Sequence, residues 1–325
     1  MSASALPTRV LVTGGAGFIG THTVRQLLQA GCQVMVIDDL RHPCGEPVPA
    51  GVELVVADMA SPEALAAMAA FRPEAVIHLA AQGGVSRSLR DPASDALNNV
   101  VGTVAVLRGA VDAGRPTIVF ASSGGAIYGR ARRLPSREGD REQPLAPYGA
   151  AKLAGEAYLG MFQRTFGLRF TAMRYGNVYG PYQDGSGEAG MVAISCQRLL
   201  QGLAPRVTGD GTQSRDFVFV EDVARANLLA MTRPLNAPVN IGTGRATSIN
   251  EIASTLLRLA EHPGSTEAAP ARPGEVKANF LNPERARSRL DWSARVALED
   301  GLRLTLDSFR LRAQAGGAVG PAPTG

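Results

Sequence analysis

Residues 9–20 read Arg-Val-Leu-Val-Thr-Gly-Gly-Ala-Gly-Phe-Ile-Gly, and the predicted fold starts from this segment. Val10, Leu11 and Val12 form an apolar run in which polar residues do not alternate with apolar ones. Such a run is typical of a strand buried on both faces in a parallel sheet. Three glycines, Gly14, Gly17 and Gly20, follow at three-residue spacing, and residues 21–30 have a helical pattern. The segment therefore predicts a strand, a glycine turn and a helix.

A strand, a glycine turn and a helix in this order form a site for a phosphate group. Gly14 can adopt a backbone conformation closed to other residues, and Gly17 has no side chain to hold a pyrophosphate away from the helix. The N–H groups and the dipole of the helix N-terminus favour an anion, and Gly20 lets the helix lie close to the strand. An ordinary tight turn is the alternative to this dinucleotide-binding unit.

Two aspartates follow the next expected strands. Asp38 ends the strand at residues 33–37 and stands eighteen residues after Gly20, close to the ~20-residue spacing of the carboxylate that binds the adenosine ribose. Since a carboxylate there repels a 2′-phosphate, the sequence favours NAD over NADP, although a solvated strand end is the alternative. Asp58 follows the strand at residues 52–56 and can accept a hydrogen bond from the adenine amino group.

Length and composition allow a substantial hydrophobic core. The chain has 325 residues, 45% of them hydrophobic, which is room for about two domains of ~150 residues. Cys32, Cys44 and Cys196 are far apart and have no metal-binding spacing, so we expect reduced thiols, no metal and a cytoplasmic location. No apolar run reaches the ~18 residues of a membrane span, and the first eight residues do not form a signal peptide.

Positive charge is concentrated in one stretch of the chain. The net charge is +4, and residues 130–141 contain five arginines. Acidic residues interrupt this run and no aromatic residues stand in it for base stacking, so a solvated loop is expected and no nucleic-acid partner. The excess of positive charge also favours an anionic substrate.

Strands and helices alternate through the first half of the chain. This order predicts an α/β fold, a Rossmann-type doubly wound parallel sheet with helices on both faces. Small residues, Ala80 and Ala81, follow the fourth expected strand before Gln82 and let the backbone approach a dinucleotide. Asn99 lies inside the expected helix at residues 95–114, where asparagine is unfavourable, which indicates a polar role; an exposed surface position is the alternative.

Tyr148 and Lys152 lie four residues apart at the start of an expected helix, so their side chains share one face. A tyrosine acts as a general base only if its pKa falls from ~10 to near neutrality, which requires ~4 kcal/mol of differential stabilisation. Burial raises that pKa, so positive charge from Lys152 and from an oxidised nicotinamide ring has to dominate. A hydroxyl from Ser123 or Ser122, at the end of the preceding strand, can bind the same substrate oxygen.

The motifs TGGAGFIG, HLAAQ, FASS before IYG, YGAAK and RYGNVYGP occur in this order. Together they resemble the extended short-chain dehydrogenase/reductase family, and within it the nucleotide-sugar 4-epimerases of the UDP-glucose (UDP-galactose) 4-epimerase type, over residues 9 to about 308. The resemblance implies bound NAD, a UDP-sugar substrate and a smaller C-terminal substrate-binding lobe. It also implies a homodimer joined by a four-helix interface from residues 95–114 and 148–166.

The resemblance implies roles for the residues that match its motifs. The positions that match cofactor contacts are Gly14, Gly17, Phe18, Ile19, Gly20, Asp38, Asp39, Asp58, Met59, Ala80, Ala81, Gln82, Asn99, Tyr148 and Lys152. The positions that match contacts to the diphosphate and nucleotide of the substrate are Asn177, Arg215, Arg272 and Glu275. Arginine forks also suit phosphate oxygens on chemical grounds.

The serine position departs from the family pattern. The family has Ser or Thr four residues before the tyrosine of the YG pair, where this chain has Gly124. Aligned from the strand FASS, Ser123 falls in place and the extra residue lies in the following loop. Ser123 is therefore the predicted catalytic hydroxyl, with Ser122 as the alternative.

The predicted reaction is 4-epimerisation of a UDP-hexose or UDP-hexuronate through transient oxidation to a 4-keto sugar. UDP-glucuronate decarboxylases and nucleotide-sugar 4,6-dehydratases share that oxidation, but they carry carboxylates just after the Ser or Thr, where this chain has Gly124, Gly125 and Ala126. A catalytically silent NAD-binding sensor is the remote alternative, and the intact Tyr148 and Lys152 argue against it.

The two expected domains alternate along the chain. Residues 1–178, with returns to the sheet at 217–220 and 239–241 (within 217–243), form the expected NAD-binding domain. Residues 179–216 and 244–312 form the expected substrate-binding lobe. The tail, residues 313–325, lacks apolar bulk and is expected to be disordered.

Overall fold

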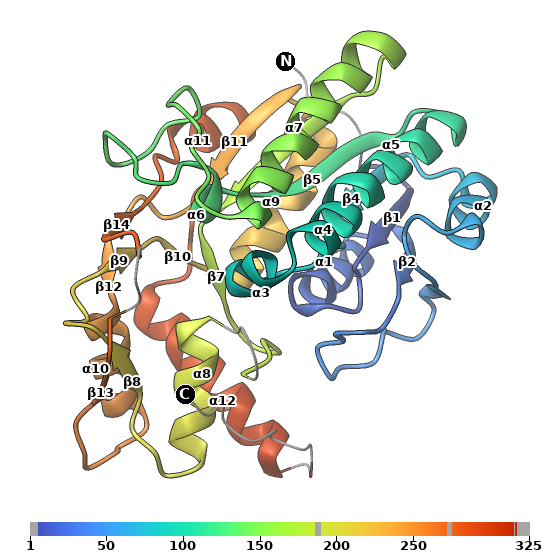
Figure 1. The fold of residues 1–325 in the computed structure, drawn as a ribbon. Coiled ribbons are helices and arrows are strands. Elements are labelled where there is room, and N and C mark those ends of the chain that lie inside the picture. The colour runs from blue at the N-terminus through green and yellow to red at the C-terminus, as the bar shows by residue number, and fades with distance from the viewer. Residues whose placement is uncertain (1–5, 186–189, 272–274, 315, 317–325) are drawn as a thin grey trace.

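The computed structural model describes residues 6–185, 190–271, 275–314 and 316. Its centre is a seven-stranded sheet in the order β11-β6-β5-β4-β1-β2-β3, in which every neighbouring pair is parallel (Figure 1). Its strands are β1 (Arg9–Thr13), β2 (Gln33–Asp38), β3 (Glu53–Val56), β4 (Ala75–His78), β5 (Thr117–Ser123), β6 (Phe170–Tyr175) and β11 (Ala237–Ile241). The predicted Rossmann-type sheet is confirmed.

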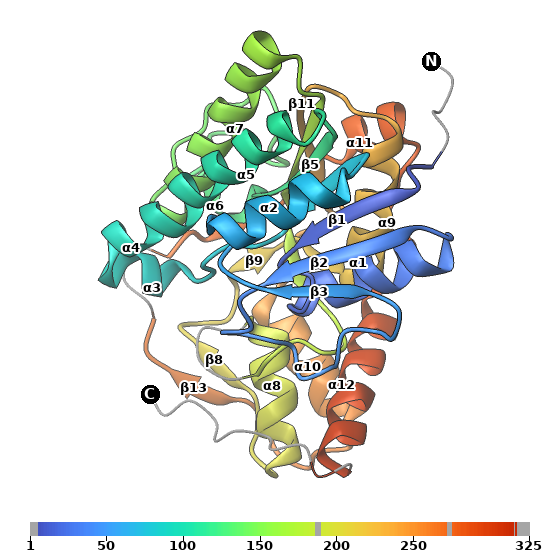
Figure 2. The same ribbon diagram turned by 90° about the vertical axis from the view of Figure 1, so that its right-hand side faces the viewer.

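Helices cover both faces of this sheet, as Figure 2 shows. One layer contains α1 (Phe18–Gln29), α9 (Val220–Thr232) and α11 (Glu284–Leu290), and the other contains α2 (Pro62–Phe71), α5 (Gly102–Asp112) and α7 (Pro147–Phe166). Within β1, Val10 and Val12 pack into the first layer and Leu11 into the second, and all three are fully buried. The unbroken apolar run of β1 therefore serves two hydrophobic cores.

The long helix expected at residues 95–114 is interrupted. It consists of α4 (Pro92–Ala96), a π-helical turn η1 (Leu97–Val101) and α5, with the short helix α3 (Val85–Arg90) before it. Helix α1 begins at Phe18, three residues earlier than its sequence pattern indicated. Helix boundaries of this kind depend on backbone geometry that side-chain periodicity does not record.

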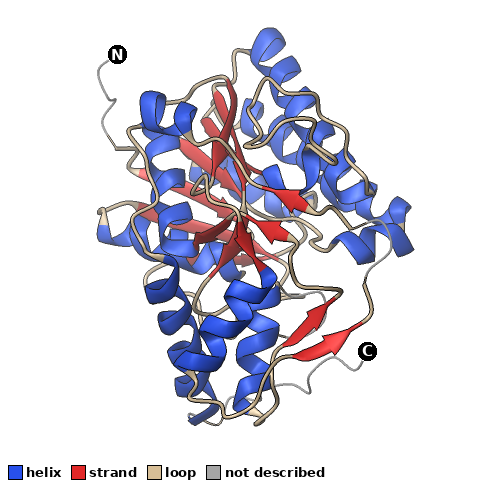
Figure 3. Ribbon diagram, turned by 90° about the vertical axis from the view of Figure 1, so that its left-hand side faces the viewer, coloured by secondary structure: helices blue, strands red, loops and turns tan. Residues whose placement is uncertain are grey.

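A third hydrophobic core lies beyond the carboxyl edge of the sheet, among the helices in the lower part of Figure 3. Its helices are α8 (Met191–Leu200), α10 (Ile249–Leu259) and α12 (Leu298–Gln314). Three small sheets accompany them: β7 (Asn177–Tyr179) with β10 (Phe217–Phe219), β8 (Arg206–Thr208) with β13 (Glu267–Ala269), and β9 (Ser214–Arg215) between β12 (Thr247–Ser248) and β14 (Ala278–Asn279).

Two predictions about the second half of the chain were wrong. Strand β10 does not return to the central sheet, because it pairs with β7 in a sheet of two strands, whereas β11 does return beside β6. Residues 313–314 belong to α12 rather than to a disordered tail, and residues 315 and 317–325 lie outside the described part of the chain. The domain boundaries stay a prediction. Among the described residues, no helix is both long and apolar enough to cross a membrane.

Replacing Gly20 with alanine tests the contact between α1 and β1. A Cβ at Gly20 would lie 2.2 Å from the carbonyl oxygen of Gly14, and neither backbone segment can move freely. We expect Gly20→Ala to lower the free energy of unfolding by about 1–3 kcal/mol, as overpacking does, and to lower the NAD content of the purified protein. Gly139→Ala is the matched control, since a Cβ there meets no atom within 4 Å. Equal urea midpoints for the two variants would contradict this packing.

Candidate functional site

The glycine turn brings the N-terminus of α1 against the carboxyl edge of the sheet. Gly14 has a φ of +72°, and a Cβ there would lie 2.6 Å from the backbone nitrogen of Ala80. Gly17 is the N-cap of α1 and makes no side-chain capping bond, and the first turn contains no acidic residue. The turn therefore leaves a helix N-terminus suited to an anion.

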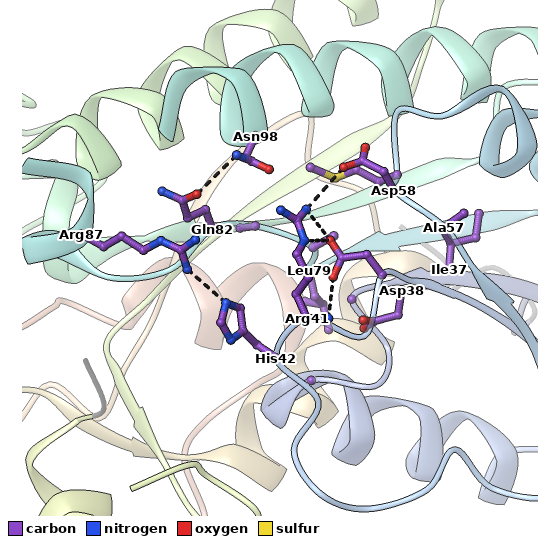
Figure 4. A pocket seen from close by; sticks show the side chains of 16 residues that line it. Ile37, Asp38, Arg41, His42, Ala57, Asp58, Leu79, Gln82, Arg87 and Asn98 are labelled. Carbon is purple, nitrogen blue, oxygen red and sulfur yellow. Dashed lines mark hydrogen bonds and ion pairs between the residues drawn. The ribbon is translucent and has the colours of Figure 1, made fainter. Parts of the chain in front are cut away.

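A cleft opens beside this turn, along the ends of β1, β2, β3 and β4 (Figure 4). It encloses about 750 Å³ of space between the atoms, which includes open solvent at its mouth. The predicted cofactor residues that line it are Gly14, Gly17, Asp38, Asp39, Asp58, Met59, Ala80, Ala81 and Gln82. A glycine cradle and a carboxylate at the second strand end together fit NAD.

The acidic end of the cleft is bound to backbone and to one arginine. Asp38 accepts hydrogen bonds from the N–H of Ala16 at 3.0 Å and of Leu40 at 2.9 Å; burial raises the pKa of Asp38, and these bonds oppose the rise. Arg41 bridges Asp39 and Asp58, its Nη2 lying 3.4 Å from Asp58 Oδ2 (Figure 4). Sequence reasoning missed Arg41, although its place just after two strand-end aspartates was a signal.

Asn99 stands behind the cleft rather than in its lining. Its side chain is 2% exposed, accepts a hydrogen bond from Gln82 N at 2.8 Å and donates one to Gln82 O at 3.0 Å. It thereby holds the backbone of Gln82, while Asn98 lines the cleft and donates to Gln82 Oε1 at 3.3 Å. The polar role expected of Asn99 is present, and the surface alternative is wrong. Phe18 and Ile19 open α1, where Ile19 packs on the core.

Tyr148 and Lys152 lie on the first turns of α7, as their spacing predicted. Lys152 is 3% exposed, and its Nζ lies 5.0 Å from the ring centroid of Phe120 and 5.7 Å from that of Tyr148. Burial raises the pKa of Tyr148 to about 12 and lowers that of Lys152 to about 8. Burial therefore dominates both pKa values, and the pKa of Tyr148 lies far above neutrality in this structure.

Ser122 and Ser123 point to opposite faces of β5, because successive side chains alternate along a strand. The Ser122 hydroxyl is buried and donates to Glu156 Oε1 at 2.6 Å. A Cβ at Gly125 would lie 3.7 Å from Ser123 Oγ and 3.5 Å from Asn177 Oδ1. Ser123 and Asn177 thus share one side of the site, whereas Ser122 belongs to a different group of residues.

That group of residues centres on Arg174, which is 1% exposed and which the sequence did not reveal. Its guanidinium binds both oxygens of Glu156, at 2.9 and 2.6 Å, and Glu142 at 2.9 Å. It also donates to the hydroxyl of Tyr128 at 2.9 Å. These contacts join β6 to α7 and to the loop before Tyr148. Ser122, which donates to Glu156, therefore has a structural role in this group.

Arg215, predicted to hold the diphosphate, lies on β9 and meets the segment before β14, which contains Glu275, predicted to hold the nucleotide end. Arg215 Nη2 lies 3.0 Å from Glu275 Oε1, so these two predicted residues are in contact, while Arg272 lies outside the described residues. The neighbouring Asp216 is 1% exposed and accepts from the N–H of Thr243 and Leu281, at 2.7 and 3.1 Å. Asp216 O also accepts from Asn177 N at 2.6 Å.

These contacts place Arg215 next to the site that contains Ser123 and Asn177. Asp216 is a third residue, after Arg41 and Arg174, that sequence reasoning missed, because its partners are backbone groups of distant segments. Within the described residues, no group of three or more His, Cys, Asp or Glu is placed to hold a metal ion.

Comparison with known proteins gives consistent matches along the chain. Residues 10–242 match the model of the NAD dependent epimerase/dehydratase family. A UDP-glucose 4-epimerase of Mycolicibacterium smegmatis is 39% identical over 317 residues, 94% of this chain and 100% of that protein. The Thermotoga maritima UDP-glucose 4-epimerase structure with UDP-glucose has a TM-score of 0.90 at 41% identity, over 94% of this chain and 99% of that one. The Thermus thermophilus enzyme with NAD has a TM-score of 0.87 at 40% identity, over 93% and 99%.

Alanine substitutions at Ser122 and Ser123 test which of the two serines stabilises the fold. Ser122→Ala removes a donor to the buried carboxylate of Glu156, so we expect the free energy of unfolding to fall by about 1–3 kcal/mol. Ser123→Ala is the matched control, and we expect its urea midpoint to equal that of the natural protein. A stable Ser122→Ala protein beside an unstable Ser123→Ala protein would reverse the assignment.

Proposed function

This chain belongs to the NAD-dependent epimerase/dehydratase family, and we propose that it is a UDP-sugar 4-epimerase acting on UDP-glucose. The support is one observation. Lys152 lies over the ring of Tyr148 on α7, α7 packs on β5, the strand that ends at Ser123, and the short helix α6 (Gly124–Ile127) that follows Ser123 carries no carboxylate. NAD bound in the cleft would supply the chemistry of taking the hydride from the sugar C4 and returning it to the opposite face.

Tyr148 is the proposed base for the sugar 4-hydroxyl. In the oxidation it takes the hydroxyl proton, and in the reduction it returns that proton to the C4 oxygen. Lys152, held over the phenol ring at 5.7 Å, supplies a positive charge that favours the phenolate. Because Gly149 has no side chain, the start of α7 can lie close to the residues that follow Ser123. A Cβ at position 149 would lie 2.6 Å from Ala126 O.

Ser123 is the proposed hydroxyl that orients the C4 oxygen, and Asn177 is the proposed contact to the substrate diphosphate. Arg215, which lies beside Glu275, is the proposed fork for the phosphate oxygens. The family resemblance also implies that Arg272 holds the nucleotide end of the substrate. Holding the substrate by its diphosphate leaves the keto sugar able to turn between oxidation and reduction.

The segment after Ser123, which the sequence predicted as a loop, is the short helix α6 (Gly124–Ile127), and its composition favours epimerisation over dehydration or decarboxylation. A Cβ at Gly124 would lie 2.6 Å from Leu281 Cδ1, so a larger side chain here would require Leu281 to move. Gly125 and Ala126 supply no acid or base. The keto sugar therefore meets no carboxylate from this segment that would remove a proton from C5.

The test is incubation of the purified protein with UDP-glucose and, separately, UDP-glucuronate, without added NAD, followed by NMR of the products. We expect UDP-galactose from UDP-glucose. Tyr148→Phe should reduce turnover by at least about 10²-fold, the low end for a proton-transfer group, and keep its bound NAD. A 4-keto-6-deoxy sugar or a pentose product would overturn the epimerase assignment, and epimerisation of UDP-glucuronate alone would change the sugar.

A homodimer is also proposed, with α5 and α7 at its interface. Leu97 and Val101 lie one turn apart on η1 and are 63% and 55% exposed, and Tyr158 on α7 is 38% exposed. Apolar side chains gathered in this way on a surface mark an interaction site. A second copy of this chain is the proposed occupant, because the family resemblance implies a four-helix interface from residues 95–114 and 148–166, which include these side chains.

Charging this patch tests the dimer. We expect the natural protein to elute at twice its 34.0 kDa chain mass in size exclusion with light scattering. Leu97→Glu combined with Val101→Glu should give a folded monomer, because two carboxylates oppose burial. Leu311→Glu, at a 66% exposed position of α12, is the control and should stay dimeric. A monomeric natural protein would contradict the proposal.

We propose a cytoplasmic location for the enzyme. The support is chemical, since Cys32, Cys44 and Cys196 are all free and buried. Thiols that stay reduced are typical of that compartment.

A further inference from the structure

Lys152 carries a positive charge that the fold has taken out of water. Lys152 is 3% exposed, and its ammonium lies over the faces of Phe120 and Tyr148, 5.0 and 5.7 Å from the ring centroids. Aromatic faces attract a cation but carry no full negative charge. A buried charge needs a counter-charge to remain ionised, so the negative group that serves Lys152 has to come from a neighbouring element.

Asp95 is a buried carboxylate on α4, the helix that packs against α7. It is 1% exposed; its Oδ1 accepts from Asn99 Nδ2 at 2.9 Å, and its buried Oδ2 has no hydrogen-bond partner. A buried carboxylate with one oxygen that accepts no hydrogen bond is itself unstable unless a cation lies near. Asp95 and Lys152 therefore each lack what the other supplies.

We propose that Asp95 is the buried counter-ion of Lys152 and so a positioning residue for the Tyr148–Lys152 pair. The inference rests on the function proposed above. Asp95 also holds Asn99, which clamps the backbone of Gln82 in the wall of the cleft. One carboxylate thereby links the charge of the proposed base to the shape of the cofactor site.

The titratable groups facing Lys152 from the other elements are neutral. Burial lowers the pKa of His78, on β4, to about 3, and Lys152 adds to that fall. Burial raises the pKa of Tyr148 to about 12 and also raises that of Tyr175 on β6. Burial lowers the pKa of Lys152 to about 8, and Asp95 opposes that fall. Among these groups Asp95 is the anion.

The composition of the chain allows a direct measurement, because the chain contains two lysines, Lys152 and Lys277. Protein labelled with ¹³C at lysine Cε gives one signal for each, and their shifts against pH report each pKa. The Lys277 side chain is 79% exposed and serves as an internal reference. Asp95→Asn keeps the acceptor for Asn99 and removes the charge. The matched control is Asp112→Asn, at a 55% exposed side chain of α5.

With NAD-loaded protein we expect Asp95→Asn to lower the midpoint of Lys152 by about one pH unit, the lower end of the effect of a nearby charge. The midpoint of Lys277 and both midpoints of Asp112→Asn should equal those of the natural protein. An unchanged Lys152 midpoint in Asp95→Asn would overturn the proposal. This readout does not require turnover. A protein without epimerase activity would therefore contradict the proposed function but would leave the test of the Asp95–Lys152 pair intact.

The pH profile of kcat on UDP-glucose gives a second readout. Without the charge of Asp95, the phenolate of Tyr148 loses a repulsion and the ammonium of Lys152 loses an attraction, so both pKa values fall. Both limbs of the profile should then move to lower pH. A residue with a purely structural role would lower kcat and leave the limbs in place, and that result contradicts the inference.

If Asp95→Asn does not fold, the double variant Asp95→Asn with Lys152→Met decides the question. Removing one partner of a buried pair leaves an uncompensated charge, whereas removing both does not. A cooperative thermal transition regained in the double variant supports the pair. A double variant as disrupted as the single one overturns it.

Discussion

The parallel direction of the seven central strands is the constraint on which the rest of the structure depends. All seven strands of the central sheet run in one direction, so their carboxyl ends lie at one edge. Gly14, Asp38, Ala80 and Ser123 each stand at or just after the end of a different strand. Residues that are far apart in the chain therefore meet at this edge, and the helices fix how closely they approach.

This constraint explains how much of the site the sequence could predict. Asp38 and Ser123 were found because a short apolar run shows where a strand ends, and the strand end fixes the place of the next side chain. Strand β10 was assigned to the wrong sheet, since its apolar residues fit a central strand and a small one equally well. Asn99 was recognised as a polar residue inside a helix, but its partner, the backbone of Gln82, leaves no mark on the sequence.

Arg174 and Asp216, two of the residues that sequence reasoning missed, share one property: their partners come from segments remote in sequence. Arg174 binds Glu156 and Glu142, and Asp216 accepts from backbone after β11 and before α11. A buried charge of this kind is stable only when all partners are in place. These two groups therefore fix the loop before Tyr148 and the segment beside Asn177, so that the precision of the site depends on contacts outside it.

The same pairing bears on which reaction the keto sugar undergoes. Three glutamates follow Ser123 within about thirty residues, and any of them free at the site would offer a base to the sugar C5. Glu156 and Glu142 are held by Arg174 on the Ser122 side of β5, and Glu138 accepts from the backbone of Asn240 at 2.9 Å. Carboxylates in such contacts do not turn toward Ser123 without leaving Arg174 buried and unpaired. The fold thus supports the proposed epimerisation in two ways: it holds these glutamates in other contacts, and it positions Tyr148 as the proposed base.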